Sequence, residues 1–478
     1  MPDLAQRRTH RRPIRQTLSG AGCRAAGLGA AGLAALLLAA CGSASSSQSS
    51  SGSGSGSAGA SPSHPVTLVV QDGDGGETGL LAAYAALNKN FEAAHPGVKI
   101  KFVVKSFQDL TATLKLQLSG SSGVPDVTQD NEGYQSLGEL VTDGLVKNLD
   151  STAAADDWSA RQPESLLALD GKFSTDGKLM GTGSLYGISA TGTWVGLYEN
   201  TAIAKQLGIT KAPTTLSELE KDFAIAKAHG VLALQYGSND QGESSWLVSE
   251  VLMAQSTPQT EVGIVDGDSS TLPASMTAAA STVRSWQTDG YLTPGSAAYS
   301  STQVFNKFVG GQGLFVLSGS WGVPLPGSKA ATAKFSLIQF PMATPGENAA
   351  VASGDLPWSI PTKSPHPQLA AEYINYITSA AANAAWIANG QVGASISSDE
   401  MSDVAKDHVS GASADAVSGW LAIVQHGTPA PYLDWSTPTF LTTIGSATQS
   451  LIAGKVSPSG FTSALQADYG PFTKARHS

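Results

Sequence analysis

Cysteine is scarce in this chain, which has only Cys23 and Cys41 in 478 residues. This count excludes the small secreted domains that are held together by several disulfides. It also excludes a zinc site built from cysteine pairs, and no His-Glu-x-x-His sequence offers another one. A chain of this length buries enough apolar surface to fold without cross-links, and it is long enough for two or more domains.

The common enzyme motifs are also missing from the sequence. It has neither a Gly-x-Ser-x-Gly nucleophile elbow nor a Gly-Lys-Ser/Thr nucleotide loop. We therefore predict that the protein is not an enzyme and that it needs no cofactor and no metal. A pair of carboxylates brought together by the fold, as in a glycosidase, remains an alternative.

Charged residues make up only 14% of the chain, and basic residues are the fewer kind. Residues 1–40 carry six Arg and one Asp, so without them the 28 basic and 38 acidic residues fall to 22 and 37, a net charge of −15. Nucleic acid and anionic lipid both bind to basic surfaces. We therefore expect neither of them as a partner.

Long apolar runs are limited to one, from Ala25 to Ala40, and it follows a segment rich in Arg. A basic segment, an apolar run and small residues at its end are the pattern of a secretory signal. Leu38-Ala39-Ala40-Cys41 resembles the lipobox of bacterial lipoproteins. The resemblance implies that residues 1–40 are a cleaved signal peptide, that the Cys41 thiol carries a diacylglyceryl group, and that the lipid anchor of the mature N-terminus includes palmitate. An ordinary signal and a single transmembrane anchor are the alternatives.

Residues 41–64 consist almost entirely of Ser, Gly and Ala after the cysteine. Such a segment buries too little apolar surface to offset the entropy of ordering, so we expect a flexible tether. Together, the signal, Cys41 and the tether predict an extracytoplasmic protein that is lipid-anchored to the outer face of the cell membrane. The lipid would be its only contact with the membrane.

Strand and helix patterns alternate beyond the tether. Apolar and β-branched residues predict strands over Val66–Val70 and Val98–Val104, and helical spacing connects them over Leu80–Ala94. A further helix over Phe107–Leu118 leads to a third predicted strand over Gly123–Val127. Alternating strands and helices indicate open α/β sheets, which bind ligands in the loops at the ends of their strands.

The loop after the first strand has Asp72 and Asp74 at the spacing of a calcium loop. However, Gly76 stands where a third oxygen ligand is needed, and Ala83 stands where a calcium loop has its bidentate Glu. The sequence therefore favours an ordinary turn at this position.

Several short motifs follow one another from about Val66 to Ala467 in the order that is typical of one family. They are Phe91-Glu92-Ala93-Ala94-His95-Pro96-Gly97-Val98-Lys99-Ile100, Gly123-Val124-Pro125-Asp126-Val127, Gly144-Leu145-Val146-Lys147-Asn148-Leu149-Asp150, Leu185-Tyr186-Gly187-Ile188, Gly196-Leu197-Tyr198-Glu199-Asn200, Ala212–Leu219, Gly319-Ser320-Trp321 and Pro367–Ile374. In these motifs the chain resembles the sugar-type (family 1) extracellular solute-binding proteins of ABC importers.

The resemblance implies an α/β, two-lobe periplasmic-binding-protein-like fold of type II, with lobes joined by crossing hinge strands. Lobe one would comprise residues 65–190 plus 356–401, and lobe two residues 191–355 plus 402–478. The implied function is to capture a sugar or oligosaccharide between the lobes and deliver it to ABC permease subunits, as a monomer. The alternatives are a secreted carbohydrate-active enzyme, a receptor of the same fold for a non-sugar solute such as a polyamine or a phosphorylated alcohol, and a ligand-sensing partner of a signalling protein.

Tryptophan is the most informative residue type that is present, because five of the nine lie in loop-like contexts. A pyranose has an apolar C–H face that matches an aromatic ring, and its hydroxyl rim matches carboxylates and amides. The predicted ligand-binding residues are Asp72, Gln129, Asp130, Asn131, Trp194, Glu243, Trp246, Trp321, Trp358 and Trp435. Trp286, Trp386 and Trp420 lie on periodic helical stretches, so we expect them to pack in the core.

Overall fold

The computed structural model describes residues 64–326, 328, 334–395 and 411–476. The predicted signal peptide, Cys41 and nearly all of the predicted tether lie outside these residues. Among the residues that are described, no helix is both long enough and apolar enough to cross a membrane.

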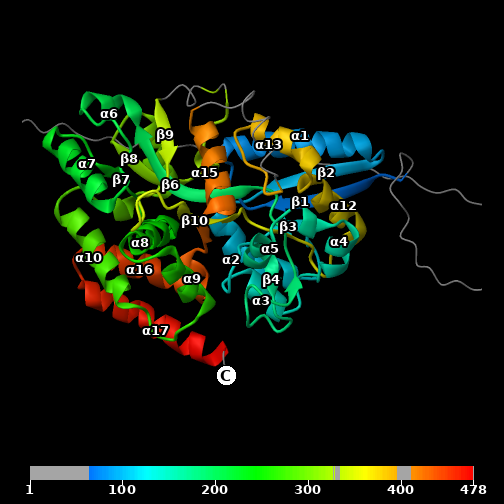
Figure 1. The fold of residues 1–478 in the computed structure, drawn as a ribbon. Helices are drawn as coiled ribbons and strands as arrows, with labels where there is room; N and C mark the ends of the chain where they lie inside the picture. The colour runs from blue at the N-terminus through cyan, green and yellow to red at the C-terminus, as the bar shows by residue number, and fades with distance from the viewer. Residues whose placement is uncertain (1–63, 327, 329–333, 396–410, 477–478) are drawn as a thin grey trace, which may run out of the picture. The chain divides into compact units, whose positions relative to one another are not determined.

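The N-terminal part of the chain builds a first sheet with the strand order β11-β3-β1-β2. β1 (Val66–Asp72) pairs in parallel with β2 (Val98–Val104) and with β3 (Val127–Gln129), and β11 (Trp358–Ser359) pairs antiparallel with β3. Helix α1 (Thr78–Ala94) connects β1 to β2 and runs along them (Figure 1). Its apolar residues recur every three or four positions, so one face is buried on the sheet. The predicted strand–helix–strand unit is therefore confirmed.

The third strand differs from the sequence prediction, which placed it over Gly123–Val127. The ladder with β1 begins only at Val127, because Pro125 has no N–H to donate and the Asp126 carboxylate accepts a hydrogen bond from the Val69 N–H at 2.7 Å. The strand consequently extends to Gln129 and brings the segment that follows it to the end of β1.

A second sheet has the order β12-β10-β6-β8-β7, and β9 also pairs with β6. Its strands are β6 (Gly192–Asn200), β7 (Leu234–Gln235), β8 (Phe315–Gly319), β9 (Phe335–Ile338), β10 (Ala349–Gly354) and β12 (Thr428–Ala430). Strand β6 is buried along almost its whole length. A short hairpin of β4 (Lys172–Phe173) and β5 (Ser184–Leu185) stands apart from both sheets.

Two adjacent crossings between the first and second sheets lie within the described residues. One leads from Ile188 into β6, and the other leads from β10 to Trp358 in β11. The crossings are joined by backbone hydrogen bonds: Ile188 and Trp358 exchange N–H···O bonds of 3.3 and 2.9 Å, and Asp355 N donates to Thr191 O at 2.8 Å. The predicted α/β, two-lobe fold with crossing hinge strands is confirmed.

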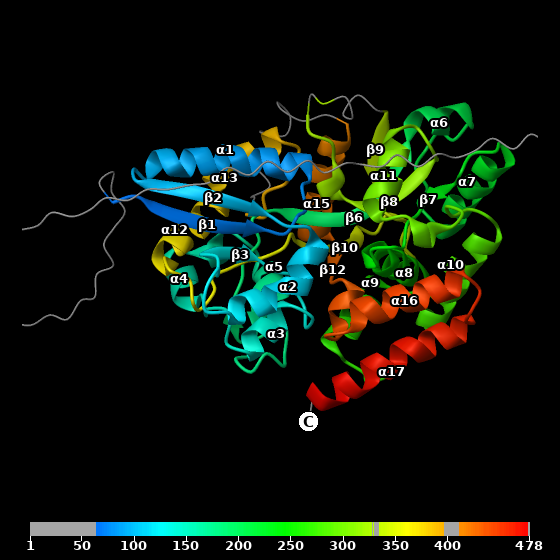
Figure 2. The same ribbon diagram turned by 180° about the vertical axis from the view of Figure 1, so that it is seen from behind.

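Helices cover the faces of both sheets. Helices α13 (Ala380–Ala388) and α12 (Pro367–Ile377) pack against α1, and α15 (Ala412–His426) packs on β6 and β9. Helix α8 (Gly242–Gln255) packs on β8 and β10 of the second sheet. Helices α10 (Ala274–Thr288), α16 (Phe440–Ile452) and α17 (Pro458–Arg476) pack against α8 or against one another, and α16 and α17 lie side by side (Figures 1 and 2). The other helices are α2 (Phe107–Ser119), α3 (Leu137–Thr142), α4 (Asp150–Ala155), α5 (Glu164–Gly171), α6 (Thr201–Gln206), α7 (Leu216–Ala228), α9 (Pro258–Asp266) and α11 (Ser301–Val309).

The three tryptophans that were expected in the core are buried. Trp286 on α10 packs in the cluster around the second sheet, and Trp386 on α13 packs in the cluster around the first sheet. Trp420 on α15 belongs to a third cluster, on the other face of β6. The predicted boundaries of the two lobes include residues that the structure does not describe. These boundaries remain a prediction.

Candidate functional site

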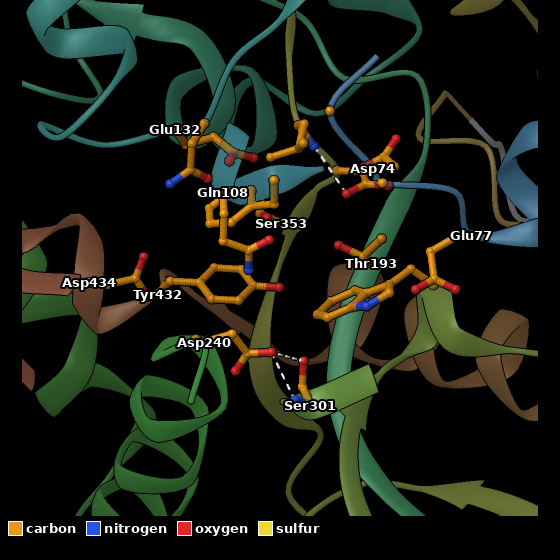
Figure 3. A pocket seen from close by; sticks show the side chains of 18 of the residues that line it. Asp74, Glu77, Gln108, Glu132, Thr193, Asp240, Ser301, Ser353, Tyr432 and Asp434 are labelled. Atoms are coloured by element: carbon orange, nitrogen blue, oxygen red, sulfur yellow. Dashed lines mark hydrogen bonds between the residues drawn. The ribbon is translucent and has the colours of Figure 1, made fainter. Parts of the chain in front are cut away.

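A cavity of about 280 Å³ opens where loops from the first sheet meet loops from the second. The first side contributes the loop after β1 (residues 73–77) and residues 131–132 after β3, and the second side contributes residues 240–246, Trp321 and residues 432–435. The crossing segments lie between them with Thr193 and residues 353–356. Figure 3 shows side chains from all of these segments around one space. The cavity thus lies at strand ends, where open α/β sheets bind ligands.

Aromatic rings form one wall of the cavity. Trp246 and Trp321 meet edge to face with their ring centroids 5.2 Å apart, and Tyr432 and Trp435 lie 5.0 Å apart. Trp321 is half-buried and packs against the hydrophobic clusters of both sheets. The remaining ring surface faces the cavity and offers an apolar platform for a flat ligand.

Two glycines make room for these rings. A Cβ atom on Gly319 would lie 1.9 Å from the Trp321 ring, and a Cβ atom on Gly133 would lie 2.5 Å from the Cβ of Trp435. Gly133 also has a φ of +78°, which favours glycine. Any larger residue at either position would displace the ring.

Polar side chains surround the aromatic wall. Asp240 Oδ2 accepts hydrogen bonds from Ser301 N at 2.8 Å and Ser301 Oγ at 2.5 Å (Figure 3). Asp434 accepts from Ser245 Oγ at 2.8 Å and from Gln135 Nε2 at 3.0 Å. Because Asp434 and Gln135 come from opposite sides of the cavity, this bond connects the two sides.

Carboxyl groups gather on the side of the first sheet, where Asp74, Glu77, Glu132 and Asp355 line the cavity. Burial raises the pKa of Glu77 to about 7, and the charge of Asp355 adds to the effect. Burial and the charge of Asp74 raise the pKa of Asp355 well above its usual range. Burial raises the pKa of Asp72, just behind, to about 7. These shifts arise because charged groups lose water and lie near like charges.

Four of the ten predicted ligand-binding residues line the cavity: Asn131, Trp246, Trp321 and Trp435. Asn131 and Trp435 are almost fully buried, and Trp246 and Trp321 are half-buried. They come from separate elements, and the fold brings together residues that are up to 304 positions apart in the sequence. Ligand contact by these residues remains a prediction.

The other six do not line the cavity, and four of them are polar side chains buried in the interior. Gln129 holds the loop after β1, because it accepts from Gly73 N at 2.7 Å and donates to Asp74 at 3.0 Å. Asp72 and Asp130 are fully buried behind this loop and beside β11. Glu243 accepts from Gly237 N at 2.9 Å.

The last two are tryptophans, and both pack in the interior. Trp194 is 1% exposed and donates to Ala416 O at 2.9 Å, and Trp358 is 0% exposed in the cluster of the first sheet. Their position on the crossings is as expected, but their rings point into the core. A buried ring gains more from packing than it would from facing a solvated cavity.

The sequence-based list of ligand-binding residues contains none of the six acidic residues that line the cavity, nor Tyr432. The six are Asp74, Glu77, Glu132, Asp240, Asp355 and Asp434. The signal was present for some of them, because Glu132 directly follows the predicted Asn131 and Asp434 directly precedes Trp435. Asp355 follows Gly354 at the return crossing, and only the fold shows that it faces the cavity. In the part of the chain that the structure describes, no three His, Cys, Asp or Glu side chains are placed to hold a metal ion.

Comparisons with known proteins agree with this architecture. The family model "Bacterial extracellular solute-binding protein" matches residues 74–384. No curated protein sequence matches the chain. Among solved structures, a chitin oligosaccharide binding protein is similar with a TM-score of 0.71 at 18% identity, covering 87% of this chain and 100% of its own.

Two further structures are similar at the same level. The GacH receptor of Streptomyces glaucescens GLA.O, described unliganded and with acarbose, has a TM-score of 0.67 at 17% identity and covers 85% of this chain and 98% of its own. The solute-binding protein RafE in complex with raffinose has a TM-score of 0.63 at 18% identity and covers 85% and 100%. At these identities the likeness shows the fold.

Proposed function

This chain belongs to the bacterial extracellular solute-binding proteins, and we propose that it captures a carbohydrate between its two lobes and delivers it to an ABC importer. The observation that carries the proposal is the composition of the cavity. Trp246, Trp321 and Tyr432 offer ring faces for the C–H face of a pyranose, and polar side chains from both sides surround them. A pyranose presents the two matching surfaces, an apolar C–H face and a rim of hydroxyl groups.

The hydroxyl rim of a sugar would meet two kinds of partner. Carboxylate oxygens of Asp240 and Asp434 accept hydrogen bonds. Asn131 is 5% exposed, and its amide nitrogen has no acceptor among the described residues. Hydrogen bonds to charged groups are stronger than those between neutral groups, so a few of them orient the ring. The similar structures described above, a chitin oligosaccharide binding protein, an acarbose complex and a raffinose complex, support the same class of ligand.

Capture would proceed by closure of the lobes around the ligand. Direct contacts already join residues 133–135 to the opposite side: Gln135 reaches Asp434, and Arg476 Nη1 donates to Tyr134 Oη at 2.5 Å. A ligand that touches both sides binds the closed form more tightly, and it therefore shifts the population toward closure. Permease subunits would recognise the closed form, and partner subunits of the importer would supply the ATP-dependent step.

Location follows from the sequence. We propose that Cys41 carries the lipid anchor and that residues 41–64 let the folded part work at a distance from the outer face of the membrane. Anchoring would keep the receptor near its importer and raise the effective concentration of the complex.

Isothermal titration calorimetry of the folded, ligand-free protein against a panel of mono- and oligosaccharides tests the proposal. We expect heat of binding with at least one carbohydrate and unchanged sugar in the recovered mixture. Absence of heat with every member of the panel would contradict carbohydrate capture. Appearance of shortened glycans would instead favour the glycosidase alternative, which needs a pair of carboxylates beside the substrate.

A further inference from the structure

We propose that the bound carbohydrate is positively charged, an amine-bearing sugar whose ammonium group binds between Asp74, Glu132 and Asp355. This inference rests on the proposed function and adds the chemical class of the ligand. It is carried by the charge balance of the cavity, by an unpaired buried carboxylate and by the arrangement of the acidic side chains around Asp355.

The charge balance of the cavity is one-sided. Among the described residues, its lining has the six carboxyl side chains of Asp74, Glu77, Glu132, Asp240, Asp355 and Asp434, and it has no Lys, Arg or His. One or two carboxylates are enough to accept hydrogen bonds from sugar hydroxyls. Glu132 and Asp434 are buried and the other four are half-buried. Six carboxylates so placed without a counter-charge are costly, because they lose hydration and repel one another. A cationic ligand supplies the missing counter-charge.

Glu132 provides a separate observation that points to a ligand. Its side chain is only 2% exposed, it lines the cavity, and its Oε1 atom has no hydrogen-bond partner among the described residues. A buried carboxylate oxygen normally has a partner, and leaving it without one costs free energy. Figure 3 shows that Glu132 and Asp74 both lie along the part of the cavity that the first sheet contributes.

Asp355 connects the acidic groups. Its charge raises the pKa of Glu77 and of Glu132, for which burial is the larger cause, and Asp74 acts in the same way on Asp355. Asp72 and Asp170 lie behind, and burial raises the pKa of Asp170 to about 8, with the charge of Asp355 as a further cause. Part of this cluster therefore holds protons near neutral pH. Binding of an ammonium group would lower these pKa values and release protons.

An organic cation fits the site better than a metal ion does. The described carboxyl groups are not arranged as a metal-binding set. Trp246, Trp321 and Tyr432 supply ring faces that attract both C–H groups and ammonium groups. Hydroxyl and amide groups of Gln108, Thr193 and Ser301 also line the cavity and match sugar hydroxyls, which a plain polyamine lacks.

Calorimetry with matched ligand pairs tests the inference. Each pair has one sugar ring with either an ammonium or a hydroxyl group at the same carbon: glucosamine and glucose, galactosamine and galactose, mannosamine and mannose, and the β-1,4-linked disaccharides of glucosamine and glucose. In at least one pair we expect the amine to bind about thirtyfold or more tightly than its neutral partner near pH 7, as befits a buried charge pair. Titration in two buffers of different ionisation enthalpy should show proton release with the amine only.

Two variants and a control test where the ammonium group of the ligand binds. Asp355→Asn and Glu132→Gln keep the side-chain shape, and each should reduce amine affinity roughly tenfold or more. Glu261→Gln is the matched control, because Glu261 is fully buried with a pKa raised by burial to about 8 but does not line the cavity. Circular dichroism and melting curves would confirm that each variant is folded.

The outcomes separate this inference from the proposed function. Neutral sugars binding as well as or better than every amine partner would overturn the inference and leave carbohydrate capture intact. Spermidine, included as a cation without a sugar ring, would overturn both proposals if it alone bound, and absence of binding by every ligand would also overturn both. Equal loss of amine affinity in Glu261→Gln and Asp355→Asn would overturn the placement of the charge.

Discussion

At the scale of single residues, Trp321 is the side chain on which ligand binding should depend most. Its half-buried ring contacts the clusters of both sheets and faces the cavity. Replacing it by Ala should weaken carbohydrate binding by about 2 kcal/mol, roughly thirtyfold, because an aromatic anchor at the centre of a site carries much of the affinity. Titration calorimetry measures the change.

The conservative variant distinguishes a ligand platform from a packing residue. Trp321→Phe keeps a ring and should recover part of the affinity, whereas Trp286→Phe, in the core around the second sheet, should lower the melting temperature and leave affinity nearly unchanged. If Trp321→Ala bound its ligand as tightly as the unaltered protein, the aromatic wall would have no role in recognition.

The buried carboxyl groups predict a dependence of stability on pH. Asp72 and Glu77 have pKa values raised to about 7, and Asp170 to about 8, mainly by burial. In the unfolded chain these groups ionise near their ordinary pKa values, so between roughly pH 4 and pH 8 the folded protein binds more protons than the unfolded one. Stability contributed by these groups therefore falls as the pH rises through this window, and it levels off above it.

Melting curves of the ligand-free protein at several pH values check this expectation. The melting temperature should be higher at roughly pH 5 than at pH 8, and Asp170→Asn and Glu77→Gln should each flatten the profile. A melting temperature that rises steadily over the same range in the unaltered protein and in both variants would show that these carboxyl groups are not buried as described.

The chemistry of the site could be predicted only in part at this scale. Asn131, Trp246, Trp321 and Trp435 were identified because they follow strands or lie in polar loops, and all line the cavity. Trp194 and Trp358 carried the same sequence signal, but their rings point into the core. Residue type and loop context cannot tell on which side of a strand a ring lies when both faces are buried.

At the scale of elements, the 3₁₀ turn over Ser320–Gly322, directly after β8, positions Trp321 in the aromatic wall. A Cβ atom on Gly319 would overlap the Trp321 ring, whereas a Cβ atom on Gly460 in helix α17 would make only ordinary contacts, the nearest at 3.4 Å. Gly319→Ala should therefore displace the ring and reduce carbohydrate affinity roughly tenfold without touching the ligand itself.

The matched substitution, Gly460→Ala, should leave affinity unchanged and slightly raise stability, because Ala favours helix more than Gly does. Calorimetry and melting curves on both variants make the comparison. Unchanged affinity in a folded Gly319→Ala protein would contradict the account of how this turn holds Trp321.

Local patterns were enough to predict most of the first sheet. The strands at Val66 and Val98 and the helix between them have clear periods of two and of three to four, and the structure confirms them. The contact between the two crossings could not be predicted in this way. Its hydrogen bond from Asp355 N to Thr191 O joins residues that are 164 positions apart in the chain. A contact between distant residues leaves no periodic pattern in the sequence. The cluster of acidic residues around Asp355 and Asp74 could therefore be identified only from the fold.

At the scale of the whole molecule, the account predicts that the protein is held at the membrane by lipid alone. Cys41→Ser removes the only thiol left after cleavage of residues 1–40, so the variant should shift from the membrane fraction to the medium. Fractionation followed by immunoblotting measures the shift. Retention of the variant in the membrane after high-salt and carbonate washes would favour an uncleaved transmembrane anchor instead.

The central claim is that a carbohydrate binds between the lobes on the aromatic wall, and a crystal structure of the protein with its tightest sugar tests it most directly. The account predicts a sugar ring stacked on Trp321 within the cavity, in contact with residues from both sheets and with an amine group beside Asp355 and Glu132. A sugar bound elsewhere on the surface, with this cavity filled only by water, would contradict the account.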